Sequence, residues 1–153
     1  MVKKLFSKKT AAETGRNDAA NDVGDELALA IAALMVEAAR ADDHYEEREK
    51  TIITRGLATM FELKDDAAAA LCASAEKSQA EALDIQRFTR IAKTMTADDK
   101  ITFLETMWEI ILSDGERDPY EDTLMRRICG LIYVEDRESG HARARVEARL
   151  SAK

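Results

Sequence analysis

The sequence lacks most of the features that indicate an enzyme or a membrane protein. It contains one proline and six glycines among 153 residues, so few positions interrupt helices. No apolar run approaches the ~20 residues that a membrane-spanning helix requires. There is also no glycine-rich phosphate loop, no nucleophile elbow, no HExxH sequence and no zinc-ligand spacing. These absences argue against the common hydrolytic, redox and nucleotide-dependent enzymes.

Cysteine and histidine are equally sparse. Cys72 and Cys129 form no CxxC pair and no Cys/His cluster, and His44 and His141 lie far apart in the sequence. We therefore expect reduced, partly buried thiols and no catalytic histidine. The first residues include lysines but no apolar stretch before a small-residue cleavage site, so we find no export signal. We expect a cytoplasmic protein that is not an enzyme.

Charge divides the chain into two unequal parts. The net charge is −7, and residues 1–16 carry five basic side chains and one acidic one. The remainder is therefore strongly acidic, which argues against nucleic-acid binding and favours cations or basic partners. We interpret residues 1–22 as a flexible basic tail and residues 23–153 as one domain. A sharper alternative takes the lysines around Leu5 and Phe6 as a weak membrane-surface contact.

Apolar residues recur at helical spacing along most of the domain, so we predict an all-α fold, a compact bundle of about seven helices. Thr96 and Asp99 have the spacing of a capping box, and Pro119 suits a first helical position. Trp108 lies at helical spacing among apolar residues and is expected in the core. The expected helices cover residues 25–41, 46–61, 66–79, 85–95, 96–112, 119–134 and 136–150.

A helix, an acidic turn and a second helix occur twice, which predicts a degenerate internal repeat. In both units a glutamate lies five residues before an aspartate, and a later glutamate falls in the first turn of the next helix. A short turn could bring the three carboxylates of a unit to one corner. The candidate residues are Glu37, Asp42 and Glu49 in the first unit and Glu109, Asp114 and Glu121 in the second.

Three interpretations of the acidic turns remain open. The carboxylates cap helices and turns, or they hold a hard divalent cation such as Ca²⁺ or Mg²⁺, or they form a docking surface for a basic or metal-bearing partner. The spacing does not match the 12-residue EF-hand loop. A metal-dependent enzyme would need a general base beside the carboxylates, and only His44 lies near them in sequence.

Three short segments resemble the TerB-like family, named for a tellurite resistance protein. They are EAARADD at residues 37–43, DIQRFTR at 84–90 and SDGERDPYE at 113–121. The resemblance implies an all-α bundle of about seven helices with an internal repeat, and a link to tellurite and other chemical stress. Related modules occur beside J-domains, metal sensing and membrane-associated assembly have been proposed, and no catalytic reaction is attached to the family.

Position by position, the resemblance places the family's acidic turn at Asp42 and Asp114 and its following glutamate at Glu49 and Glu121. The first turn departs from the pattern, because Asp43 stands where the second turn has Gly115. We therefore expect a non-enzymatic, stress-associated module that binds a divalent cation or a protein partner through an acidic surface. The alternative is a metal-independent interaction scaffold of the co-chaperone type.

Overall fold

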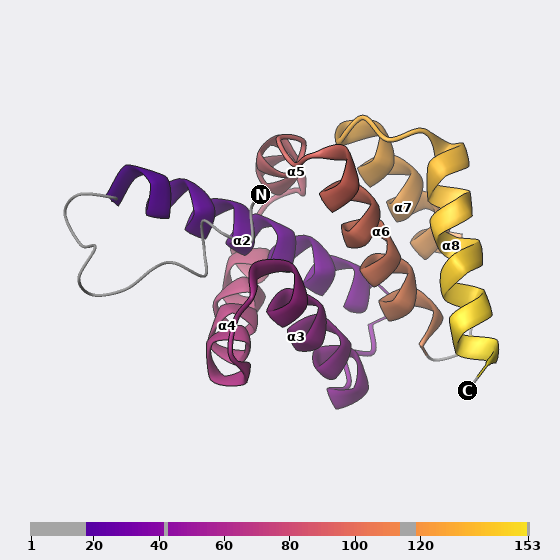
Figure 1. Ribbon diagram of the computed structural model, residues 1–153, viewed down its shortest axis with the longest axis horizontal. Helices are drawn as coiled ribbons and strands as arrows, with labels where there is room; N and C mark the ends of the chain where they lie inside the picture. Colours follow the sequence, from indigo (N-terminus) through magenta and orange to yellow (C-terminus); the bar gives the residue numbers. More distant parts are fainter. Residues whose placement is uncertain (1–17, 42, 114–118, 153) are drawn as a thin grey trace.

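The computed structural model describes residues 18–41, 43–113 and 119–152, and this part of the chain is built from seven α-helices without a strand (Figure 1). The predicted all-α bundle is confirmed. The helices are α2 (Asp18–Ala39), α3 (Glu47–Phe61), α4 (Asp65–Glu81), α5 (Gln86–Ala92), α6 (Ala97–Leu112), α7 (Pro119–Leu131) and α8 (Asp136–Ser151).

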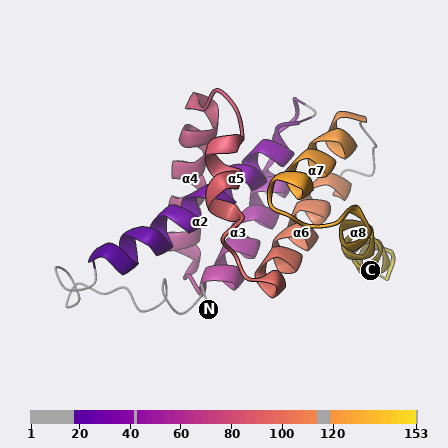
Figure 2. The same ribbon diagram turned by 90° about the horizontal axis from the view of Figure 1, so that it is seen from above.

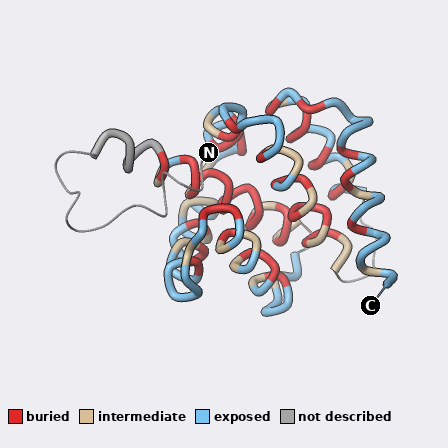
Figure 3. Tube along the Cα trace, viewed as in Figure 1, coloured by how far each residue is buried: buried red, intermediate tan, exposed pale blue. Residues whose placement is uncertain are grey.

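The C-terminal half of α2 is the centre of the bundle. From Leu27 to Ala39 every residue is buried except Leu29 and Glu37, which are half-buried. The helix packs against α3, α4, α5 and α6. Figure 2 shows these helices around α2, and Figure 3 shows that most of this half of α2 is buried. Its many alanines have short side chains, so neighbouring helices can approach closely on several sides.

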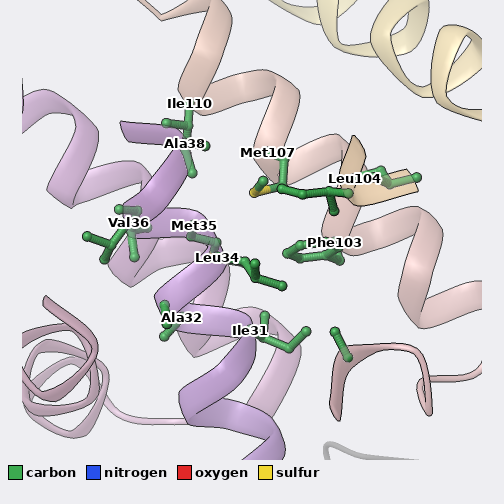
Figure 4. Close-up of a cluster of buried hydrophobic side chains, with 14 of the residues drawn as sticks. Ile31, Ala32, Leu34, Met35, Val36, Ala38, Phe103, Leu104, Met107 and Ile110 are labelled. Carbon is green, nitrogen blue, oxygen red and sulfur yellow. The ribbon is translucent and has the colours of Figure 1, made fainter. Parts of the chain in front are cut away.

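The contact between α2 and α6 forms much of the apolar core. Ile31 and Leu34 of α2 lie opposite Phe103 of α6 in Figure 4, and all three side chains are fully buried. Complete burial of side chains of this size contributes about 1.5–3 kcal/mol each. Ile101, at the start of α6, is half-buried.

The second half of the chain packs α6 against α8. Trp108 is buried as predicted, and its indole Nε1 donates a hydrogen bond to Ser139 Oγ at 3.1 Å. The Arg143 guanidinium lies 4.9 Å from the centre of the Trp108 ring. The indole therefore fixes α8 through one hydrogen bond and one cation–π contact.

Several helix ends match the sequence signals. Thr96 Oγ1 accepts a hydrogen bond from the backbone N–H of Asp99 at 3.2 Å, and α7 begins at Pro119. α5 ends at Ala92 rather than near residue 95, because the N–H of Thr94 and of Met95 each bond a carbonyl three residues back, which closes the helix with tight turns.

Helix α2 starts earlier than expected, at Asp18, within the range assigned to the tail. Residues 1–17 lie outside the described residues, so the flexible tail and its weak membrane contact stay predictions. Within the described ranges, no helix is long and apolar enough to cross a lipid bilayer. Leu57 of α3 and Ile128 of α7, which the proposed repeat equates, are both buried. The repeat itself stays a prediction.

Gly56 allows α3 and α6 to pack closely. A Cβ at this position would lie 2.8 Å from Thr106 Cγ2 of α6. Thr106 is buried, and its Oγ1 donates to the carbonyl of Thr102 at 3.1 Å, so its methyl group has little freedom to move. Gly140 of α8 offers the opposite case, because a Cβ there would meet nothing within 4 Å.

We predict that Gly56→Ala destabilises the protein by about 1 kcal/mol, since an overpacking cost of about 1–3 kcal/mol exceeds the gain in helix propensity of about 1 kcal/mol. Gly140→Ala should stabilise it by about 0.5–1 kcal/mol. Urea unfolding measures both. Thr106→Ser, which removes the methyl group, should recover part of the Gly56→Ala loss in the double variant. Equal effects of the two glycine substitutions would contradict the close contact.

Candidate functional site

The candidate site consists of the two helix junctions that carry the predicted acidic turns. α2 and α6 run toward the same end of the molecule, and α3 and α7 start beyond them (Figures 1 and 2). Asp42 and Asp114 lie outside the described residues. The four candidate glutamates are described, and they fall into two pairs with different surroundings.

Glu49 and Glu121 form the buried pair. Each is 4 % exposed and lies in the first turn of its helix, α3 or α7. Glu49 Oε1 accepts a hydrogen bond from the backbone N–H of Glu46 at 2.8 Å. The capping interpretation is thus confirmed for Glu49, and the positive end of each helix dipole favours a carboxylate at both positions.

Glu37 and Glu109 form the second pair, and each is bonded to a neighbouring helix. Glu37 Oε1 accepts from Gln79 Nε2 of α4 at 2.8 Å. Glu109 Oε2 lies 3.5 Å from Arg55 Nη2 of α3. Within residues 18–41, 43–113 and 119–152, no three His, Cys, Asp or Glu side chains are grouped so that they could hold a metal ion. The described glutamates alone therefore form no ligand set.

A polar network that the sequence did not reveal ties the first junction to α4. Tyr45 Oη donates to Glu76 Oε2 at 2.6 Å, and Lys50 Nζ lies 3.3 Å from the same oxygen. Arg40 Nη1 donates to the backbone carbonyl of Glu76 at 3.2 Å, and its guanidinium lies 5.2 Å from the Tyr45 ring centre. Residues on both sides of position 42 are therefore fixed on α4.

The second junction lies beside a groove between α3 and the end of α6. Its volume is about 320 Å³. Ser113, the last described residue before the second acidic turn, lines this groove together with Arg48, Arg55 and Glu109. Basic side chains of α3 thus lie next to the start of the second turn.

A family model described as "Tellurite resistance protein TerB" matches residues 28–144. The chain belongs to the TerB family. The match spans both helix junctions and all four described glutamates, as the sequence resemblance implied. No curated protein and no solved structure matches the chain.

The first junction of this TerB-family protein shifts the pKa values of three groups. Partial burial alone would raise the Glu76 pKa, but the hydrogen bond from Tyr45 and the ion pair with Lys50 outweigh it and lower the pKa below 4.5. Burial and the adjacent Glu76 carboxylate raise the Tyr45 pKa, so the phenol keeps its proton. Burial also raises the pKa of Cys72, whose free thiol lies 3.6 Å from Tyr45 Oη.

Cys72 also lines a groove of about 280 Å³ between α3 and α4. Because its pKa is raised, the thiol is protonated and weakly nucleophilic at neutral pH. Cys129 is likewise buried and free, and burial raises its pKa. Both cysteines are free and buried, and they contribute packing rather than a reactive thiolate.

We predict that the Glu76 carboxylate makes stability depend on pH. The folded-state pKa lies below the ordinary 4.5, so the contribution of the carboxylate is present above that value and is lost as the pH falls through the folded-state pKa. Glu76→Gln should therefore lower the free energy of unfolding at pH 7, and the gap to the wild type should narrow below pH ~4.5.

Urea unfolding between pH 3 and 7 measures this gap. Glu81→Gln is the matched control, because Glu81 is an exposed glutamate of the same helix with no ion pair among the described residues. It should leave stability nearly unchanged throughout. A gap between wild type and Glu76→Gln that stays constant down to pH 3 would contradict the assignment.

Proposed function

We propose that this TerB-family protein is a non-enzymatic, stress-associated module of the tellurite resistance type, and that its acidic turns bind hard divalent cations. The observation that carries the proposal is the pair of buried glutamates, Glu49 and Glu121. Both hold a carboxylate below the surface, directly after a turn that contains another acidic residue, Asp42 or Asp114. A divalent cation close by would add to the helix-dipole interaction that already favours a carboxylate at both positions.

The chemistry of these turns favours calcium or magnesium. Their candidate ligands are carboxylate oxygens, and both ions bind through oxygen, with coordination completed by backbone carbonyls and water. In the proposal, Asp42 and Glu49 bind the ion at the first turn, and Asp114 and Glu121 bind the ion at the second. Glu37 and Glu109 hold the helices in place instead, since they bond Gln79 and Arg55.

The two turns should differ in affinity. Residues on both sides of the first turn are fixed on α4 by Arg40 and Tyr45, which limits how far its oxygens can rearrange around an ion. The second turn contains Gly115, whose backbone adopts more conformations than that of Asp43. We therefore assign the tighter site to the second turn. A site that closes around the ion needs such freedom.

We predict that calcium or magnesium at 100 times its dissociation constant stabilises the protein by about 2.7 kcal/mol, because the ion binds the folded state alone. Thermal unfolding with and without each ion measures the shift. Asp114→Asn with Glu121→Gln should abolish most of it. Since Glu121 is buried, Asp114→Asn alone serves as a second variant, because it keeps the Glu121 side chain in place.

The control is Asp66→Asn with Glu81→Gln, which removes the same charges from exposed positions of α4. It should keep the full ion-dependent shift. Unchanged melting up to 10 mM of either ion would exclude the cation proposal. The same result from the control and the site variant would show that the ions act on the overall charge.

Docking of a basic protein partner is the second candidate function. It is favoured by the exposed carboxylates at the first junction, Asp43, Glu46 and Glu47. We predict that a fluorescent lysine-rich peptide binds in low salt, and that Glu46→Gln with Glu47→Gln weakens it severalfold. Fluorescence anisotropy measures the affinity. An affinity for the peptide that is unchanged by these substitutions would count against docking at this surface.

A further inference from the structure

We propose that the groove between α2 and α5 binds an acidic, apolar segment of a partner protein. The groove has a volume of about 330 Å³. Its floor and walls contain the apolar side chains of Leu29, Phe88 and Ile91, and its rim carries Arg87 and Arg90. This surface is separate from the acidic turns and has the opposite charge.

The apolar part of the groove is open to a ligand. Phe88 is buried at its base, while Leu29 and Ile91 are half-buried although they pack against the core. Half-buried leucine and isoleucine gain free energy when a partner covers the rest of their surface, at about 25 cal/mol per Å². A groove between two helices offers such a surface to one or two apolar side chains of an incoming segment.

The charged rim selects the kind of segment. Arg87 and Arg90 are exposed, and neither guanidinium forms an ion pair with any part of the chain that the structure describes. Arg87 lies 5.4 Å from the centre of the Phe88 ring, so one cation is next to the apolar floor. Among the described residues that line the groove, Glu26 is acidic and Arg87 and Arg90 are basic, so the arginines outnumber it. Aspartate or glutamate beside an apolar anchor fits this arrangement.

Electrostatic repulsion argues against three other ligands for the groove between α2 and α5. The basic segment of residues 1–16 would meet two like charges at the rim. Two copies of the chain, each with a net charge of −7, repel one another. An anionic membrane likewise repels a protein of this net charge, and two arginines supply little attraction in comparison. The net charge also acts on an acidic segment, but a short segment carries far less charge than a second copy or a membrane, and it contacts Arg87 and Arg90 directly.

The test is a selection of 16-residue peptides displayed on phage against the full-length protein, followed by fluorescence anisotropy with the selected peptides. We expect sequences that combine aspartate or glutamate with leucine, phenylalanine or methionine. Arg87→Glu with Arg90→Glu should raise their dissociation constants at least tenfold, and Ile91→Ala should raise them severalfold. Binding should weaken as salt rises from 0.05 to 0.5 M.

The matched control is Arg126→Glu with Arg127→Glu, which reverses two exposed neighbouring charges on α7. It should leave the dissociation constants within twofold, and so should Asp114→Asn with Glu121→Gln, which separates this proposal from the cation sites. Thermal unfolding checks that each variant is folded.

Four results would overturn the proposal. They are a selection that yields no binder, binders without acidic residues, binders that ignore the Arg87 and Arg90 substitutions, and peptide binding that appears only after residues 1–17 are removed. Sedimentation and flotation with phosphatidylserine vesicles cover the remaining occupants. A dimer, or vesicle binding, that is lost in the Arg87 and Arg90 variant would also overturn it.

Discussion

The burial of the C-terminal half of α2 is the constraint on which the rest of the structure depends. A helix that packs against four others needs short side chains where neighbours come close and longer ones where they leave space. The run from Ala28 to Ala39 meets both needs, with alanines interrupted by residues such as Ile31 and Met35. Because α3, α4, α5 and α6 all contact this helix, their positions relative to one another are set through it.

The same packing explains why polar side chains accumulate where α2 ends. Beyond Ala39 the chain leaves the core, and the backbone groups of the last turn need partners. Arg40 and Tyr45 connect this exit to α4, where the Glu76 carboxylate accepts a charge-assisted hydrogen bond from the phenol. Such a bond contributes about 1.5–3 kcal/mol. The first acidic turn is thus bounded by residues whose positions depend on α4.

Local signals in the sequence predicted much of the fold. Helical periodicity predicted each of the described helices, and Pro119 and Thr96 marked two helix starts. The start of α2 at Asp18 was missed because its first turns carry few apolar residues in a regular pattern. The end of α5 was missed because apolar residues continue to Met95 after the helix has closed.

The candidate site was harder to predict than the fold. Tyr45 and Glu76 are 31 residues apart, and nothing in either local sequence marks the other as its partner. The same is true of Trp108 and Ser139. The burial of Glu49 and Glu121 also went unforeseen, because an acidic residue in a first helical turn is usually solvated. Contacts of this kind depend on how the helices pack. Periodicity predicts whether a side chain faces the core or the solvent, but it does not predict which residue of another helix that side chain contacts.

The two proposed binding surfaces have opposite charge and lie at separate places along α2. Glu26 lines the arginine-rimmed groove, and Ala39 ends the helix at the first acidic junction. Ala39 lies 13 positions after Glu26 in the helix, a distance of about 20 Å at 1.5 Å per residue, so two ligands would not collide. α2 is held by four neighbours, which disfavours a shift that would couple the sites. A protein with two independent surfaces of opposite charge brings two ligands together by raising their effective concentration, without a conformational change.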